Sequence, residues 1–473
     1  MNTKTRNISI TFSGQTLLNM KEIVAKQRKF FNSNQTKDID FRIDQLKKFR
    51  RLIKENEPLL YKAIYSDFQK SAFNTFTVEL ALLYAEIDDI VKNIKKWAKW
   101  KRVRTNLANL PARSYIIPEP LGVSLIIGAW NYPYQLSLAP AVTSIGAGNT
   151  VILKPSELPS ESSRAMAQLI NNNFDPAFFT VVEGGIQETT ELLTQRFDKI
   201  LFTGSVAVGR IVYQAAAKHL TPVTLELGGK SPVIVTEDCN LETCIKRLVW
   251  AKFLNAGQTC IAPDYVLVPP SIKQKFIDLT IKEIKKEQFA VENHNYVQII
   301  NARNIKRLAG LLDHEKVCFG GGYNEHTRIF EPTIMDNVDF NDKIMQEEIF
   351  GPILPVLTYD SLDKAIEKIK EREKPLSCYV FTNNKKIRNK ILTEISFGGG
   401  SVNDAVMHTA NSHLPFGGVG ESGTGSYHGK HGFEEFSHFK SVLDKPTWIE
   451  PNFKYFPHTE SKLKVIKRMM GVN

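Results

Sequence analysis

Apolar residues recur at helical spacing through the first hundred residues of the chain. Leu46, Phe49, Ile53 and Leu60 follow one another at steps of three, four and seven positions, with basic side chains between them. This spacing places them on one face of a helix, and the segment Val78–Trp100 repeats the pattern. The chain is therefore predicted to be helical up to about residue 101.

The pattern changes at Arg104–Pro120, where prolines separate short β-prone pieces such as Ser114–Ile117. Proline interrupts regular elements, whereas β-branched and aromatic residues favour strands. This segment is therefore predicted to form an extended arm or a hairpin.

From Gly122 onward, short apolar runs alternate with helix-like stretches. Buried strands that alternate with helices predict parallel βαβ units with helices on both faces of each sheet. The fold class is thus α/β, with two Rossmann-like parallel-sheet domains. The predicted elements are strands at Val123–Ile127, Thr150–Leu153, Phe178–Val182, Lys199–Phe202, Val233–Val235 and Tyr265–Val268, and a Lys-rich helix at Ile272–Lys286.

Composition supports a multidomain globular protein. A chain of 473 residues, 42% hydrophobic and 23% charged, is too long for a single core. No apolar run approaches the ~18 residues of a membrane span, and Met1–Gln15 lacks the apolar centre of a secretion signal. The five cysteines form no Cys-x-x-Cys pair and no metal-binding spacing with histidine, which predicts free thiols, no metal site and a cytoplasmic location.

The net charge of +11 lies in the first 110 residues, which hold 22 Lys and Arg against 11 Asp and Glu. Basic side chains such as Lys47, Lys48 and Arg51 interleave with apolar ones at helical spacing, as on the solvated face of a helix. We therefore expect no nucleic-acid partner. Binding to a nucleic acid is the less favoured alternative, and it would depend steeply on salt.

Two segments carry residues suited to acyl chemistry. Cys260 ends the stretch FLNAGQTC, and Glu226 lies in LELGGK. A thiolate can attack a carbonyl carbon and hold the product as a thioester, and a carboxylate can activate the water that releases it. Asn131, in GAWNYP, follows a predicted strand, and ligands of open α/β sheets gather at that edge.

A nucleotide-binding loop is predicted within ILFTGSVAVGR at 200–210, which runs from a strand through a glycine turn into a helix. The stretch GVGESG at 418–423 fits G-x-G-x-x-G literally, but no strand precedes it, so it is rejected. KPSE at 154–157 and EEIFGP at 347–352 are two further polar turns beside predicted strands.

These motifs resemble, in kind and order, those of the aldehyde dehydrogenase superfamily over roughly residues 40–445. The resemblance implies that Cys260 is the nucleophile and Glu226 the general base, and that the amide of Asn131 helps to bind the oxyanion. It implies NAD as cofactor, with NADP left open, because the carboxylate of Glu157 disfavours a 2′-phosphate. The implied cofactor residues are Lys154, Glu157, Gly204, Ser205, Gly209, Glu348 and Phe350.

The resemblance also implies an aldehyde dehydrogenase-like organisation with a small oligomerisation arm. The expected parts are an NAD(P)-binding domain at 1–225 interrupted by the arm at 104–120, a catalytic domain at 226–401, an oligomerisation or bridging segment at 402–450, and a basic tail at 451–473.

The late segments LPFGGVG and GSYHGK resemble the class 3 branch, as does the short stretch before the first helices. That branch implies a homodimer that oxidises medium-chain, long-chain or aromatic aldehydes. The tail KLKVIKRMM is too short and too charged to span a membrane, and weak contact with a lipid surface is a minor alternative. The expected substrate funnel consists of Tyr132, Tyr134, His413 and Phe416.

Two alternatives to this function remain at the level of sequence. A semialdehyde dehydrogenase would use the same chemistry, but it needs cationic groups in the funnel. A non-catalytic protein that kept the fold would be expected to lose Cys260, Glu226 or Asn131, and all three are present.

Overall fold

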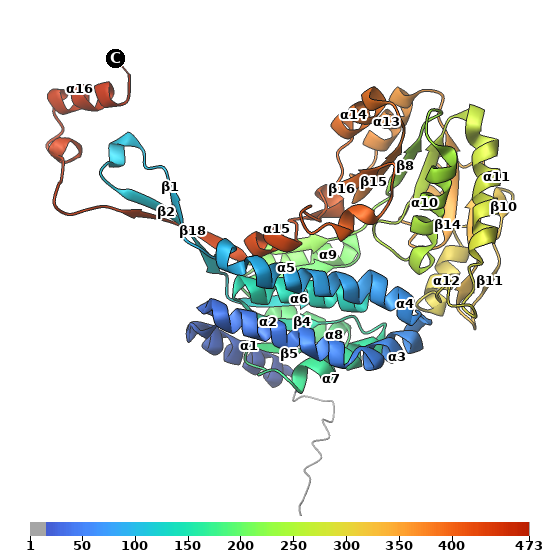
Figure 1. The fold of residues 1–473 in the computed structure, drawn as a ribbon, viewed down its shortest axis with the longest axis horizontal. Coiled ribbons are helices and arrows are strands. Elements are labelled where there is room, and N and C mark those ends of the chain that lie inside the picture. The colour runs from blue at the N-terminus through green and yellow to red at the C-terminus, as the bar shows by residue number, and fades with distance from the viewer. Residues whose placement is uncertain (1–15, 473) are drawn as a thin grey trace, which may run out of the picture.

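The computed structural model describes residues 16–472. Two α/β units, each a sheet with helices around it, lie side by side, and an arm projects from one of them (Figure 1). The helical N-terminal region agrees with the prediction from apolar spacing. Its elements are α1 (Thr16–Asn32), α2 (Ile39–Glu55), α3 (Glu57–Phe68), α4 (Ala72–Thr75), the π-helical turn η2 (Phe76–Leu80) and α5 (Ala81–Trp97).

The first sheet has six strands in the order β17-β7-β6-β3-β4-β5, and all pairs are parallel except β17 with β7. Its strands are β3 (Val123–Ile127), β4 (Thr150–Lys154), β5 (Phe179–Val181), β6 (Lys199–Thr203), β7 (Val223–Glu226) and β17 (Gly423–Thr424). Its helices are α6 (Pro133–Ala147), α7 (Ser160–Asn171), α8 (Ile186–Thr194) and α9 (Val206–Ala217).

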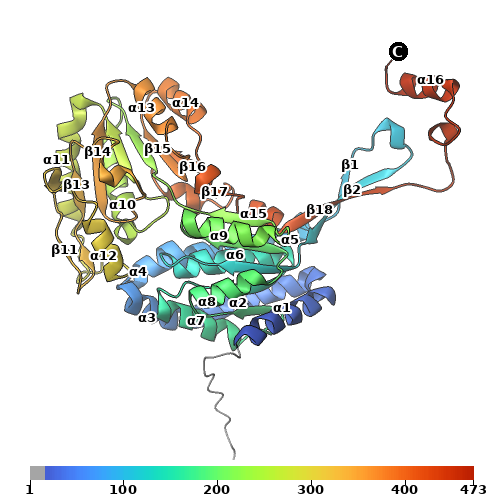
Figure 2. The same ribbon diagram turned by 180° about the vertical axis from the view of Figure 1, so that it is seen from behind.

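Burial explains the apolar runs of this sheet. Every residue of β3, β4 and β6 is buried, because helices cover both faces of the sheet. Helix α6 is buried on all sides between the sheet and α5, which explains why it is apolar all round (Figure 2).

The second sheet has seven strands in the order β10-β13-β14-β9-β8-β15-β16, parallel except for β10. Its strands are β8 (Pro232–Val235), β9 (Tyr265–Val268), β10 (Val317–Phe319), β13 (Thr333–Met335), β14 (Ile353–Thr358), β15 (Ser377–Phe381) and β16 (Gly399–Val402). Around it lie α10 (Leu241–Phe253), α11 (Pro270–Glu287), α12 (Ala302–Ala309), α13 (Leu362–Lys370), α14 (Lys385–Glu394) and the hairpin of β11 (Tyr323–Asn324) and β12 (Ile329–Phe330).

The two parallel sheets confirm the predicted fold class. Strand β7 ends at Glu226, so this residue belongs to the first sheet and not to the second domain, in which the boundary at residue 226 had placed it. The cause is that β7 pairs with β6 along its full length, up to Thr203 opposite Glu226.

The arm is a three-stranded antiparallel sheet in the order β1-β2-β18. Strands β1 (Lys101–Val103) and β2 (Arg113–Pro120) form a hairpin, and β18 (Ser437–Asp444) runs along β2 over its whole length. Between the second sheet and the arm, the chain adds β17 to the first sheet and packs α15 (Gly429–Glu435) on α6.

The C-terminal helix α16 (Glu460–Met469) lies beside the arm, away from both sheets (Figures 1 and 2). Within residues 16–472, no helix combines the length and the apolar character that crossing a bilayer requires.

Candidate active site

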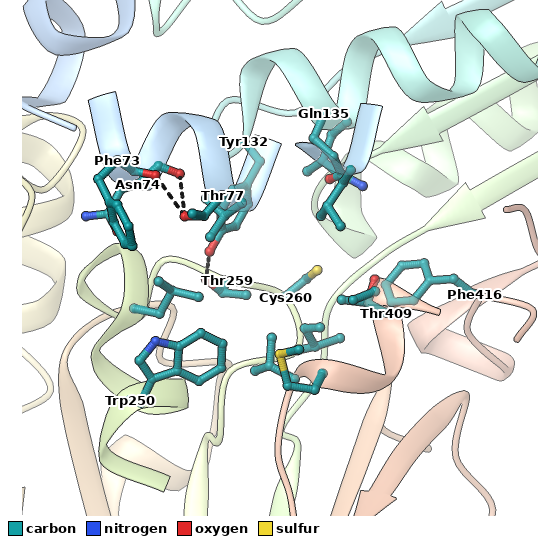
Figure 3. A pocket seen from close by; sticks show the side chains of 18 of the residues that line it. Phe73, Asn74, Thr77, Tyr132, Gln135, Trp250, Thr259, Cys260, Thr409 and Phe416 are labelled. Carbon is teal, nitrogen blue, oxygen red and sulfur yellow. Dashed lines mark hydrogen bonds between the residues drawn. The ribbon is translucent and has the colours of Figure 1, made fainter. Parts of the chain in front are cut away.

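A cavity of about 370 Å³ ends at Cys260. Figure 3 shows this side chain pointing into the space between Tyr132 and Gln135 on one side and Trp250 on the other. None of the lining residues, all of which are described, carries a charge. The apolar part of the lining comprises Phe73, Val78, Leu82, Leu136, Trp250, Leu254, Ile261, Val406, Met407, Ala410 and Phe416.

A sharp turn after α10 places Cys260 at the end of the cavity. Asn255, Ala256 and Gly257 all have left-handed backbone angles, with φ of 55°, 52° and 71°. A Cβ at Gly257 would come within 2.3 Å of the carbonyl oxygen of Gly351, so this approach requires glycine. The unusual backbone explains why a glycine stands three residues before the thiol.

The Cys260 thiol is only partly exposed and lies near two carboxyl groups. Burial raises its pKa to about 12, and the negative charges of Glu348 and Glu226 add to this effect. The thiol is therefore neutral at rest, and its proton must be removed before it can act as a nucleophile.

Glu226 ends β7, and its carboxyl group is buried. Neither of its carboxyl oxygens has a hydrogen-bond partner within residues 16–472. Burial holds its pKa well above the ordinary value, and the charge of Glu435 contributes. A carboxyl group with a raised pKa and free oxygens is suited to accept a proton from water.

Asn131 lies between β3 and α6 and is buried. Its side-chain Nδ2 donates to the carbonyl oxygen of Gln258 at 3.1 Å. Because an amide NH₂ group has two N–H bonds, the second one remains free to bind an oxyanion on Cys260.

The candidate residues of the first domain gather along one edge of the first sheet. Asn131 follows β3, Lys154 ends β4, Gly204 follows β6 and Glu226 ends β7, and these four strands are parallel neighbours. Their carboxyl ends therefore share an edge, which is where α/β sheets bind ligands.

The same edge fits a dinucleotide. Ser205 caps α9 by accepting from the amide of Val208 at 3.5 Å, and a helix N-terminus binds phosphate. Lys154 is buried, with Nζ 2.6 Å from the carbonyl oxygen of Pro155, and further N–H bonds remain for a ribose. Glu157 is exposed nearby, and Gly209 packs within α9 against Leu227.

Glu348 approaches the turn after Glu226, and its carboxylate would lie 2.0 Å from a Cβ at Gly228. This contact explains the glycine after Leu227. Burial and the charge of Asp264 raise the pKa of Glu348 to about 8. The ring of Phe350 packs edge-on against Trp130, with centroids 5.3 Å apart, so this segment also lies next to the loop of Asn131.

Two of the four predicted funnel residues line the cavity, namely Tyr132 and Phe416. The placement of Tyr134 in the funnel is corrected: its side chain is fully buried, and its hydroxyl donates to the carbonyl oxygen of Leu60 at 2.7 Å. Two residues further along a helix point in nearly the opposite direction. His413 is exposed and does not belong to the lining either.

The sequence analysis missed most of the cavity wall. Trp250 lies in α10 and Leu254 begins the turn that follows it, shortly before Cys260, and this proximity could have identified them. The segment 73–78 is far from Cys260 in sequence, and it contains no motif that would mark it as part of the cavity wall. In the part of the chain that the structure describes, no group of His, Cys, Asp and Glu side chains could hold a metal ion.

The fold and this site together are those of an α/β enzyme with a candidate nucleophilic cysteine. The chain belongs to the aldehyde dehydrogenase family, whose family model matches residues 1–442. It is thus an oxidoreductase, and the family reaction uses a nicotinamide dinucleotide, as predicted.

Its relatives confirm the resemblance to the class 3 branch. Aldehyde dehydrogenase family 3 member A2 from Pongo abelii is 46% identical over 445 residues, which cover 93% of this chain and 92% of that protein. The dimeric NADP-preferring aldehyde dehydrogenase of Rattus norvegicus is 45% identical, over 94% of this chain and 99% of its own.

Two bacterial relatives are equally similar. The 4,4'-diaponeurosporen-aldehyde dehydrogenase of Staphylococcus aureus (strain NCTC 8325 / PS 47) is 47% identical over 93% of this chain and 96% of its own. The structure described as the substrate-bound state of Staphylococcus aureus AldH superposes with a TM-score of 0.93 at 45% identity, and covers 95% of this chain and 99% of that one.

Proposed function

We propose that this enzyme converts medium-chain, long-chain or aromatic aldehydes into carboxylic acids through a covalent thioester on Cys260. The observation that carries the proposal is the uncharged, mainly apolar cavity that ends at this thiol, with Glu226 and Asn131 beside it.

In the first step, the Cys260 thiol releases its proton to solvent water, and its sulfur bonds to the aldehyde carbon. The carbonyl oxygen becomes an oxyanion, which accepts a hydrogen bond from the free N–H of Asn131 and one from the backbone amide of Cys260. The bond between Asn131 and the Gln258 carbonyl holds the side-chain amide for this task.

A bound nicotinamide dinucleotide would accept the hydride that leaves the substrate carbon. The residues proposed to bind the dinucleotide are Lys154, Glu157, Gly204, Ser205, Gly209, Glu348 and Phe350. NAD is the preferred form in this proposal because Glu157 would repel a 2′-phosphate, although one relative is named as NADP-preferring.

Glu226 acts in the last step. Its carboxylate takes a proton from water as the water oxygen attacks the thioester carbon. The carbon–sulfur bond breaks to release the acid, and the proton held by Glu226 passes to the sulfur to restore the thiol. Its free carboxyl oxygens and raised pKa support this role.

The lining supports an apolar substrate. A semialdehyde carries a second, anionic group, and no lysine or arginine lies among the described lining residues to bind it. One relative is named for 4,4'-diaponeurosporen-aldehyde, which is consistent with a preference for an extended substrate.

We also propose a homodimer that pairs through the arm. Strands β1 and β18 are edges of a small sheet, and exposed apolar side chains such as Trp100, Leu107 and Phe439 lie on or near it. A relative is named as dimeric. A cytoplasmic location stays a prediction from the cysteine pattern.

A panel of aldehydes assayed with NAD and with NADP tests the substrate proposal. Each methylene buried in the cavity is worth about 0.8 kcal/mol, so kcat/KM should rise several-fold per CH₂ from acetaldehyde through hexanal to octanal, with benzaldehyde accepted. Cys260→Ala should abolish turnover, whereas Cys378→Ala, which removes a thiol buried in β15, should retain it. A flat series or a preference for succinic semialdehyde would contradict the proposal.

A further inference from the structure

A buried ion pair lies behind the loop of Asn131. The ammonium of Lys70 is 2.7 Å from a carboxylate oxygen of Glu79, and the two side chains are 1% and 0% exposed. Burying two charges is costly, and a buried pair often adds no net stability compared with apolar side chains. Its presence at this position therefore calls for a role other than stability.

Both members of the pair hold the segment that joins β3 to α6. Lys70 Nζ also donates to the carbonyl oxygen of Asn131 at 3.2 Å and lies 4.4 Å from the centre of the Tyr132 ring. The second carboxylate oxygen of Glu79 accepts from the amide of Tyr134 at 2.8 Å, in the first turn of α6. The pair thus fixes the end of this segment that leads into α6.

The fixed segment in turn contacts the residues just before Cys260. Asn131 Nδ2 donates to the carbonyl oxygen of Gln258 at 3.1 Å, and the hydroxyl groups of Tyr132 and Thr259 are 2.6 Å apart. A continuous set of contacts therefore leads from the ion pair to the residue before the nucleophile, and Figure 3 shows its last link, from Tyr132 to Thr259 beside Cys260.

The pair is also joined to the wall of the cavity. Glu79 belongs to the π-helical turn η2, and Thr77 and Val78 of the same turn line the cavity. A π-helical turn changes the direction of side chains within one helix and is often found at functional sites. Here it lets neighbouring residues serve the cavity and the ion pair.

We propose that Lys70 and Glu79 are positioning residues, which hold the Asn131 amide in the orientation that binds the oxyanion during acylation of Cys260. This inference rests on the roles proposed above for Cys260 and Asn131. Neither Lys70 nor Glu79 lines the cavity, so they act through Asn131 and Tyr132.

The test follows acylation of Cys260 by p-nitrophenyl acetate, which needs no nucleotide and releases a coloured burst for each active thiol. Single replacements would leave one charge buried without its partner, so the main variant is Lys70→Met/Glu79→Gln. Complete loss of an oxyanion donor slows a reaction ~10²–10³-fold, and we expect a misplaced donor to slow the burst roughly tenfold while the burst amplitude per folded chain stays unchanged.

A double-mutant cycle separates positioning from general structural damage. Asn131→Ala alone should slow the burst, and adding Lys70→Met/Glu79→Gln to it should slow the burst no further, because the pair acts through that amide. The matched control removes the charges of a partly buried ion pair at the amino-terminal ends of β3 and β6, opposite to the edge that carries Asn131. This variant, Arg28→Met/Asp198→Asn, should leave the burst rate unchanged.

A burst rate within twofold of wild type in Lys70→Met/Glu79→Gln, or additive effects in the Asn131→Ala background, would overturn the inference. If that variant fails to fold, the charge-conserving Glu79→Asp takes its place, because its shorter side chain keeps both charges but no longer reaches the Lys70 ammonium and the Tyr134 amide together; a slowing of at least threefold is expected, with the same twofold criterion. By contrast, a burst that persists in Cys260→Ala, or one unaffected by Asn131→Ala, would contradict the proposed function itself.

Discussion

The thiol of Cys260 and the carboxyl group of Glu226 both lie where burial favours the neutral form. The proposed reaction needs the charged form of each, because in it a thiolate attacks the aldehyde and a carboxylate takes the proton of water. The two groups also oppose each other, since the charge of Glu226 raises the pKa of Cys260.

The rate of Cys260 acylation should therefore increase with pH. With a pKa of about 12, the thiolate fraction grows roughly tenfold per pH unit throughout the range from pH 6 to 9. Glu226 is ionised at the alkaline end of this range, where Glu226→Gln removes a neighbouring negative charge, and this should lower the pKa of Cys260 and raise the rate of iodoacetamide labelling at pH 9. Labelling followed by mass spectrometry checks both points. Cys378 serves as the internal control, because it is buried with a pKa also near 12 but is remote from Glu226. A pH-independent labelling rate would contradict the prediction.

Glu226→Gln should also separate the two halves of the reaction. The amide keeps the shape of the side chain but cannot accept a proton, so deacylation should slow roughly 10²-fold or more while acylation survives. Stopped-flow measurement should show a burst of NADH followed by a slow steady rate.

The matched control is Glu86→Gln, which changes another buried acid with a raised pKa, bonded to Thr143, and should keep normal turnover. If the burst of Glu226→Gln slows as much as its steady rate, Glu226 acts before the thioester forms.

At the level of elements, the cavity is built by pieces from distant parts of the sequence. Helix α10 contributes Trp250 and continues into the turn that carries Cys260, the segment from α4 to η2 forms the opposite wall, and residues 406–410 close a third side. A substitution in α10 can therefore change the apolar wall of the cavity.

Trp250→Ala should reduce kcat/KM for octanal more than for acetaldehyde. A long chain loses contact with the indole ring, which is worth about 1–2 kcal/mol or roughly five- to thirtyfold, whereas a two-carbon substrate does not reach it. Steady-state assays with both aldehydes check this difference. Leu392→Ala, an exposed apolar residue on α14, is the control, and equal losses for both substrates would show that Trp250 acts on the catalytic turn instead.

Much of the fold was predictable because a strand buried on both faces is a continuous apolar run. The predicted strands at 123–127, 150–153 and 265–268 agree with β3, β4 and β9 within one residue. By contrast, β16 has the sequence GGSV, which has no strand character of its own, and it forms because β15 offers a free edge.

The site was predictable where chemistry leaves a local motif. Cys260, Glu226 and Asn131 stand in distinctive stretches, but the Lys70–Glu79 pair and the wall at 73–78 do not. Their role depends on which side chains meet in three dimensions. The error at Tyr134 has the same origin, since nearness to Tyr132 in sequence says nothing of helix rotation.

The arm dominates the shape of the whole molecule. It extends from the first sheet as a thin antiparallel sheet, and the C-terminal helix α16 lies beside it (Figure 1). Such a projection buries little surface within its own chain and leaves two edges open to a partner.

The protein should be a dimer in light scattering at micromolar concentration, and Phe439→Glu/Leu443→Glu should convert it to monomers. These two exposed residues are four apart on β18, so they share one face of the arm, and charges there would oppose a buried interface. Leu392→Glu, an exposed site on α14, should leave the dimer intact. A wild-type monomer would refute the proposed assembly.

The pairing of β17 with β7 sets an order in which the enzyme can be assembled during synthesis. Gly423 lies opposite Glu226, and β18 then closes on β2, so the last part of the chain completes structures begun near the start. Because a chain emerges from the ribosome N-terminus first, Glu226 stays at an open sheet edge until residue 424 has been made. A nascent or truncated chain that ends before residue 423 would therefore contain Cys260 and the parallel strands of both sheets, but it would lack the strand that pairs with β7 at Glu226.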